Sequence, residues 1–317
     1  MSLIEQAAKR LEQLRQAGVE LPGDEAAELV SPQPLPHGAT TEPKKRQMDN
    51  HDIDASGLAI QAEPSKSAIS TAKRVDLNLN AIAASGLLVP SQTRTLLANE
   101  FRVVKRPLIA NAMGKGISPI HNGNLIMITS ALPGEGKSFT AINLAISIAM
   151  EMDNTVMLVD ADVARPSVLS MLGLPSTEGL LDVVTANSLD ISGVLLRTNI
   201  EKLSILPSGT QHPRATELLA SDAMIRLLDD MAKRYPDRII IFDSPPLLAT
   251  TEARELATHM GQIVVVVQAG ETGQGAVKEA LATIEACPLK MMVLNQATQQ
   301  ASERYGYGYA YGYGNEK

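Results

Sequence analysis

Residues 129–138 contain the residue types that bind phosphate. This stretch, TSALPGEGKS, follows an apolar run over 125–128 and precedes an apolar stretch that starts at Phe139, an order that predicts a strand, a loop and a helix. Backbone N–H groups of such a loop and the positive end of the helix can surround an anion. The usual G-x-x-x-x-G-K-[ST] pattern is complete except that Ala131 replaces its first glycine. We therefore predict a loop that binds phosphates through Pro133, Gly134, Glu135, Gly136, Lys137, Ser138 and Phe139.

Acidic residues follow two further apolar runs. Asp160 and Asp162 come after the run over 156–159, and Asp243 comes after the run over 239–242. The second arrangement is typical of a Walker B strand, whose aspartate holds Mg²⁺ or its water. Three unpaired carboxylates would repel one another, so the arrangement requires Mg²⁺ and a basic side chain. We predict that Ser138, Asp162 and Asp243 hold Mg²⁺.

The C-terminal end concentrates five of the six tyrosines of the chain within nine positions. Glycine or alanine separates them, so the segment has no stiffness and no apolar partner for its rings. Each phenol is a candidate phosphoryl acceptor. A stacking platform for single-stranded nucleic acid is the alternative, but only Arg304 and Lys317 lie nearby. The candidate acceptors are Tyr305, Tyr307, Tyr309, Tyr311 and Tyr313.

The elements that must position these residues alternate between strands and helices. Besides the runs at 125–128, 156–159 and 239–242, strands are expected at 203–206, 263–267 and 291–294, with helical patterns between them. A helix is expected over 139–152, and another between Pro90 and Pro107, with a mixed-charge face that carries Lys105. This alternation predicts a doubly wound α/β fold with a mainly parallel sheet.

The flanking regions differ in composition from this central part. Residues 1–18 show one apolar stripe, typical of an amphipathic helix, and 19–74 have the Pro-rich and charged composition of a flexible linker. We expect the folded domain over 75–299, with a short extended segment over 75–79, and a flexible Tyr/Gly tail over 300–317.

Composition excludes several classes of protein. A net charge of −7 argues against nucleic-acid binding, and the single cysteine, Cys287, cannot form an internal disulfide. Neither a signal peptide nor an apolar run long enough to span a bilayer is found. We expect a cytoplasmic protein that reaches a membrane only through a partner.

Together, the phosphate loop, the segment 156–165, the Asp243-Ser244-Pro245-Pro246 strand end and the tyrosine cluster resemble the bacterial protein-tyrosine kinases of exopolysaccharide and capsule export. The N-terminal helix and residues 100–107 resemble the branch found in exosortase-associated polysaccharide loci. The resemblance implies a P-loop ATPase fold of the deviant-Walker type and ATP with Mg²⁺ as cofactors. It also implies autophosphorylation of the tail in trans, with Lys137, Asp160 and Asp162 as catalytic residues and Asp160 acting on the phenol.

The same resemblance implies partners. These are other copies of the chain in a homo-oligomer, a separate membrane protein that regulates polysaccharide chain length and activates the kinase, and a cognate tyrosine phosphatase. The chain would then lie at the inner membrane through its partner.

Two sequence features bear on these expectations, one on the choice between two functions and one on subunit contact. Partition and division-site ATPases share the fold without kinase activity, but they carry a signature lysine where this chain has Leu132, and they lack a tyrosine tail. A nucleotide-dependent scaffold of that type is the alternative function. The subunit-contact motif Glu-x-x-Arg-x-x-Arg of the kinases is matched only at Glu100 and Arg106, because Val103 occupies its middle position.

Overall fold

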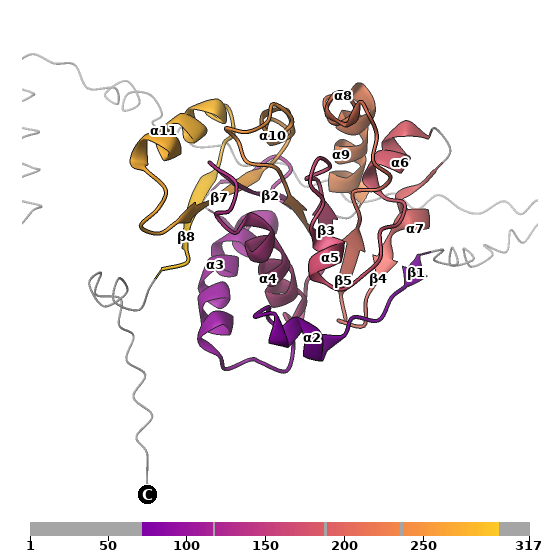
Figure 1. Ribbon diagram of the computed structural model, residues 1–317, viewed down its shortest axis with the longest axis vertical. Helices are drawn as coiled ribbons and strands as arrows, with labels where there is room; N and C mark the ends of the chain where they lie inside the picture. Colours follow the sequence, from indigo (N-terminus) through magenta and orange to yellow (C-terminus); the bar gives the residue numbers. More distant parts are fainter. Residues whose placement is uncertain (1–71, 117, 187–188, 235–236, 298–317) are drawn as a thin grey trace, which may run out of the picture. The chain divides into compact units, whose positions relative to one another are not determined.

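The computed structural model describes residues 72–116, 118–186, 189–234 and 237–297. The predictions for residues 1–71 and for the tyrosine tail lie outside these residues. The described part belongs to one compact unit, and its core is an eight-stranded sheet (Figure 1). Its strands are β1 (Lys73–Arg74), β2 (Leu125–Ser130), β3 (Thr155–Asp160), β4 (Leu196–Arg197), β5 (Leu203–Leu206), β6 (Arg238–Asp243), β7 (Gln262–Gln268) and β8 (Lys290–Asn295).

The sheet has the order β1-β4-β5-β3-β6-β2-β7-β8, and every neighbouring pair is parallel except β4 with β5. All six expected strands are confirmed, and so is the doubly wound, mainly parallel sheet. The strands β2, β3 and β6 lie at its centre. Their carboxyl ends therefore meet at one edge, where an open α/β sheet binds its ligands.

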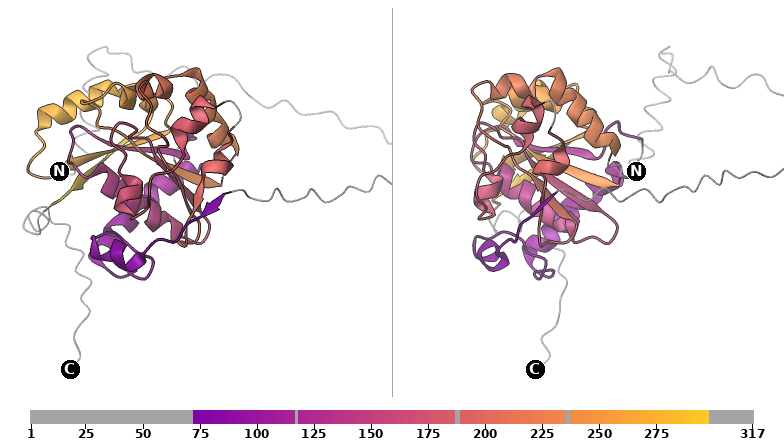
Figure 2. Two further views of the ribbon diagram at one scale, coloured as in Figure 1. Left: turned by 45° about the vertical axis from the view of Figure 1, so that its right-hand side comes forward. Right: turned by 90° about the vertical axis from the view of Figure 1, so that its right-hand side faces the viewer.

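Helices cover both faces of the sheet (Figures 1 and 2). One face packs against α2 (Leu79–Ala84), α3 (Leu96–Ala112), α4 (Lys137–Ala149) and α5 (Val168–Met171). The other face packs against α6 (Leu180–Thr185), α7 (Ile191–Val194), α8 (Ala215–Leu219), α9 (Asp222–Arg234), α10 (Glu252–Ala257) and α11 (Gln274–Thr283).

Alternate residues of the central strands divide between the two layers. In β2, Ile126 and Ile128 face one cluster while Leu125 and Met127 face the other, and all four are fully buried. Strands buried on both faces have continuous apolar sequences, which is why the sequence pattern located them.

The structure corrects the prediction for the helix before the phosphate loop. Pro107 was expected to end it, but α3 continues to Ala112 with Pro107 inside. The buried Leu108, which is only 1% exposed, lies beyond the proline, and its packing outweighs the missing backbone hydrogen bond. Among the described residues, no helix is both long and apolar enough to cross a membrane.

Lys105 is a second correction. The sequence placed it on a charged outer face, whereas the structure buries it against the end of α4. Its ammonium donates a hydrogen bond to the Ser147 carbonyl at 2.5 Å and forms an ion pair with Glu151 at 2.6 Å. A long lysine can bury its aliphatic stem when its charged end finds such partners.

The ends of two predicted segments also differ. The strand β1 begins at Lys73, before the expected domain start, and Leu79, expected in an extended segment, is the first residue of α2 after the N-cap Asn78. The helix α4 ends at Ala149 rather than at 152, and Met152 is exposed.

Candidate active site

The phosphate loop connects β2 to the N-terminus of α4. Gly134 and Gly136 both have φ of +90°, a conformation that side chains with a Cβ atom rarely adopt. These glycines let the loop turn so that α4 begins at Lys137, and the helix N-terminus points its first amides toward the loop. This is the geometry that holds phosphate oxygens in P-loop proteins.

The buried carboxylate of Glu135 stabilises the phosphate loop through hydrogen bonds. Glu135 is only 2% exposed, and its Oε2 accepts a hydrogen bond from the Leu132 amide at 2.6 Å. Its Oε1 accepts a hydrogen bond from the Thr272 hydroxyl, which follows β7. The sequence predicted Glu135 as part of the nucleotide-binding loop, and in the structure its side chain supports the loop backbone.

A second support comes from the end of β8. The Asn295 side chain donates to the Glu135 carbonyl at 2.9 Å, and the Gln296 side chain donates to the Gly134 carbonyl at 3.3 Å. The sequence analysis placed a strand here but gave neither residue a role. The position of Asn295 at the carboxyl end of a strand next to β7 was the available signal.

Two of the three predicted carboxylates form ion pairs with Lys137, and the third lies next to one of them. Its ammonium lies 2.7 Å from Asp162 Oδ2 and 4.0 Å from Asp243 Oδ1. Asp160 and Asp243 are register partners at the ends of β3 and β6. The structure therefore brings together all four residues that the sequence selected from separate segments.

Asp160 has an unusual protonation equilibrium. Burial, the negative charge of Asp243 and, to a lesser extent, that of Asp162 raise its pKa to about 7, although hydrogen bonds from the amides of Val168 and Ser167 oppose the shift. Its Oδ1 is buried and has no hydrogen-bond partner among the described residues. A carboxyl group with a pKa near neutrality is able to accept and release a proton at physiological pH.

Asp243 is completely buried, and burial raises its pKa to about 6 although the charge of Lys137 opposes this. The Ser138 hydroxyl also lowers its pKa, but no described residue lies within full hydrogen-bonding geometry of either carboxylate oxygen. Buried carboxylate oxygens without donors are expected where a cation binds.

The hydroxyl of Ser138 lies between the loop and the segment after β3. It is 2.9 Å from the Ser167 hydroxyl and 3.5 Å from the Lys137 ammonium. Ser167 also donates its amide to Asp160, so it connects the predicted metal and catalytic residues. No sequence pattern indicated Ser167, because its role depends on residues that are distant in the chain.

The charges at the site do not balance. Among the described residues, Lys137 is the only cation that forms an ion pair with any of the three aspartates. Within the same residues, no group of three or more His, Cys, Asp or Glu side chains is arranged to hold a metal by itself. Mg²⁺ in nucleotide sites is usually held by one or two protein groups together with phosphates, so a serine hydroxyl and orphaned carboxylate oxygens fit it.

The remaining predicted residues lie around this centre or outside the described part. Pro133 is exposed, and Phe139 is half-buried against the cluster that contains α3 and α4. The five tail tyrosines lie outside the described residues.

Comparisons with known proteins agree with this geometry. A family described as an AAA domain matches residues 123–297, more than half of the chain. The tyrosine-protein kinase YwqD of Bacillus subtilis (strain 168) is 33% identical over 239 residues, which cover 74% of this chain and 92% of the relative. The putative tyrosine-protein kinase EpsB of Ralstonia nicotianae (strain ATCC BAA-1114 / GMI1000) is 31% identical over 184 residues, which cover 58% of this chain and 24% of the relative.

A solved structure gives the same result. The crystal structure of the chimerical protein CapA2B2 is similar with a TM-score of 0.55 and 27% identity, over 68% of this chain and 97% of that chain. Since the AAA-domain match spans the phosphate loop and all three aspartates, and YwqD is matched along nearly its whole length, the chain belongs to the family of bacterial tyrosine-protein kinases.

Proposed function

We propose that this chain transfers the γ-phosphoryl group of ATP to protein tyrosine, chiefly to the tail of another copy, and thereby regulates exopolysaccharide biosynthesis and export. The observation that carries the proposal is the convergence of Lys137 with Asp160, Asp162 and Asp243 beside the phosphate loop. The similarity to YwqD and EpsB, both named as tyrosine-protein kinases, supports tyrosine as the acceptor.

Different residues are assigned to the phosphates and to Mg²⁺. The loop amides and Lys137 would bind the β and γ phosphates, and Ser138, Asp162 and Asp243 would hold Mg²⁺. When bound, Mg²⁺ neutralises charge on the phosphates. Lys137, now paired with Asp162, would exchange that carboxylate for phosphate oxygens.

Asp160 is assigned to the acceptor. A tyrosine phenol has a reference pKa of about 10, so little phenolate exists at neutral pH. The phenol oxygen bonds to the γ phosphorus, ADP leaves, and the phenol proton passes to a base. Asp160, with its pKa raised to about 7 and its Oδ1 unpartnered, suits that role better than an ordinary aspartate.

Loss of the Lys137 ammonium tests the site. We expect Lys137→Met to lose essentially all phosphotyrosine formation in MgATP, as seen on a phosphotyrosine blot of the purified protein, because no other cation pairs with Asp162 in the described structure. Lys115→Met is the matched control, since Lys115 is exposed and outside the site, and it should be labelled like wild type. Full labelling of Lys137→Met would contradict the assignment.

The same experiment separates the two candidate functions. A regulatory ATPase of the partition type would release inorganic phosphate from MgATP without forming phosphotyrosine. We expect both products from this chain, with labelling that depends on the tail tyrosines.

Partners follow from the proposal. We propose that copies of the chain assemble so that the tail of one enters the site of a neighbour. A tyrosine phosphatase would remove the phosphate from the labelled tyrosines. A membrane protein of the polysaccharide machinery would recruit and activate the kinase at the cytoplasmic face of the membrane. The matches to relatives of very different length, 92% of YwqD but 24% of EpsB, support a kinase unit that works with another protein segment. Comparable activity and membrane recruitment with and without that membrane protein would contradict this arrangement.

A further inference from the structure

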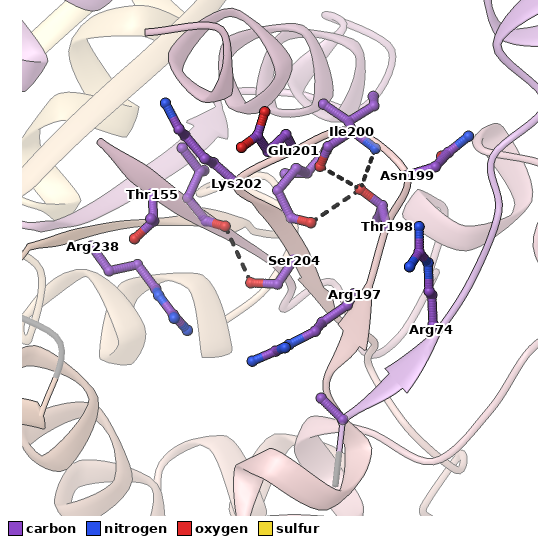
Figure 3. Close-up of a pocket in the computed structure, with 13 residues that line it drawn as sticks. Arg74, Thr155, Arg197, Thr198, Asn199, Ile200, Glu201, Lys202, Ser204 and Arg238 are labelled. Carbon is purple, nitrogen blue, oxygen red and sulfur yellow. Dashed lines mark hydrogen bonds between the residues drawn. The ribbon is translucent and has the colours of Figure 1, made fainter. Parts of the chain in front are cut away.

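A pocket of about 530 Å³ lies at the end of the sheet opposite to the phosphate loop (Figure 3). Thr155, Leu203 and Arg238, which line it, are the first residues of β3, β5 and β6. Asp160 and Asp243 are the last residues of two of these strands. At about 3.3 Å per residue, six-residue strands place the pocket roughly 16 Å from the aspartates, so it is a separate site.

The lining of the pocket is strongly basic. Arg74, Arg197, Lys202 and Arg238 line it, and Glu201 is the only acidic residue among the lining side chains. The Lys202 ammonium donates to backbone carbonyls of the loop before β3, at 2.7 and 2.9 Å. Arg74 and Arg197 are therefore the candidate basic donors to a ligand.

Two of the arginines come from paired strands. Arg74 and Arg197 are register partners on the neighbouring parallel strands β1 and β4, and both are exposed. Neither guanidinium forms a hydrogen bond or ion pair with any side chain of residues 72–116, 118–186, 189–234 or 237–297. In Figure 3, Arg197 and Arg238 extend toward each other below Ser204.

Two hydroxyl residues lie at the base of the pocket. The Thr155 Oγ1 atom is buried and has no hydrogen-bond partner among the described residues. The Ser204 hydroxyl donates to the Val156 carbonyl at 3.2 Å and keeps its lone pairs. Val156 and Leu203 also line the pocket, but they are 0% and 4% exposed and their side chains belong to the core beneath it.

We propose that this pocket binds the phosphate group of a phosphate monoester. Guanidinium groups match oxyanions with paired N–H donors. The volume lies within the range of small-molecule sites and exceeds what a phosphate ion needs, so the pocket has room for the organic group of a monoester. Phosphotyrosine and a sugar phosphate share this chemistry, and the test distinguishes them.

The pocket also gives such a ligand a structural effect. Arg74 belongs to β1, the two-residue strand at the edge of the sheet, and Arg197 belongs to the strand that it pairs with. An anion bound by both arginines would therefore connect β1 to β4.

The test measures binding rather than kinase activity, so its failure leaves the proposed function untouched. The full chain is saturated with a non-hydrolysable ATP analogue and Mg²⁺ to fill the phosphate loop, and ³¹P NMR then follows O-phospho-L-tyrosine, glucose 1-phosphate and inorganic phosphate. We expect saturable binding of at least one monoester, tighter than that of inorganic phosphate. The monoester that binds more tightly identifies the source.

Substitutions assign the binding to the pocket. Arg197→Gln should weaken monoester binding about tenfold or more, because it removes charge-assisted hydrogen bonds, whereas Arg197→Lys should weaken it less. Arg226→Gln is the matched control, since Arg226 is exposed on α9 outside the pocket, and it should bind like wild type. Unchanged affinity in Arg197→Gln, or no saturable binding up to about 10 mM, would overturn the proposal.

Discussion

Burial raises the pKa values of Asp160 and Asp243 more than any single neighbouring charge does. It is the largest cause of the raised pKa of Asp160, about 7, and of Asp243, about 6. Folding therefore makes Asp160 bind a proton that the unfolded chain would release above about pH 4. Because the folded state binds more protons in this interval, stability falls as the pH rises from about 4 to about 7.

Asp160→Asn should reverse this loss in the nucleotide-free protein. The amide cannot ionise and keeps an acceptor for the amides of Ser167 and Val168. We expect the free energy of unfolding to rise by up to about 4 kcal/mol at pH 8, and by less than half of that gain at pH 5. Urea unfolding at both pH values measures the difference.

The control for this prediction is Asp153→Asn, because Asp153 is exposed and should show no gain at either pH. An equal gain for Asp160→Asn at pH 5 and pH 8 would show that ionisation of Asp160 is not its cause.

Among the secondary-structure elements, α3 carries an evident internal weakness. Pro107 lies in its middle and is exposed, so it removes a helical hydrogen bond without adding buried contacts. Alanine is favoured over proline by about 3 kcal/mol in a helix interior, and the more flexible unfolded chain offsets up to about 1 kcal/mol of this.

Pro107→Ala should therefore raise the free energy of unfolding by about 1 kcal/mol or more, measured by urea unfolding at neutral pH. Arg106→Ala, at the neighbouring exposed position, is the control and should change stability by less than about 0.5 kcal/mol. A loss of stability in Pro107→Ala would mean that the proline stabilises a local bend that the neighbouring packing requires.

The elements also show what the sequence could predict. Parallel central strands such as β2 and β6 were located because burial on both faces leaves a continuous apolar run. The two-residue strands β1 and β4 were not predicted, since pairing of such short segments depends on their neighbours and leaves no periodic pattern.

In the candidate site as well, residues in local sequence patterns were predicted and residues that depend on distant neighbours were not. Lys137 and the three aspartates were predicted, because a phosphate loop and the ends of apolar strands are local patterns. The supports from Ser167, Thr272 and Asn295 were not, because each is a hydrogen bond between segments far apart in the chain. Lys105 was placed wrongly because lysines are ordinarily exposed.

For the assembled protein, the proposed function predicts a switch in oligomeric state. Each phosphotyrosine adds about −1.5 to −2 charge at pH 7, so a fully labelled tail gains roughly −8 to −10. A tail of this charge should be repelled from a site that already holds Asp160, Asp162 and Asp243. We expect wild type in MgATP to move from oligomer toward monomer as labelling proceeds, as followed by mass measurement in solution.

Two variants control for effects unrelated to tail phosphate. Lys137→Met should stay assembled in MgATP because it cannot label itself. Phenylalanine keeps the rings without the acceptors, so the variant in which it replaces the five tail tyrosines should also show no ATP-driven change. An unchanged mass of wild type after complete tail labelling would contradict the switch.

The hydrogen bonds from Asn295 and Gln296 to the phosphate loop have a thermodynamic consequence. The predicted tail over 300–317 begins only a few residues later, so these contacts join the proposed nucleotide-binding loop to the segment that leads to the tail. Coupling between two binding events is reciprocal. Suppose that bound nucleotide changes the affinity of a neighbouring subunit for the tail by a certain factor. Binding of the tail then changes the affinity for nucleotide by the same factor.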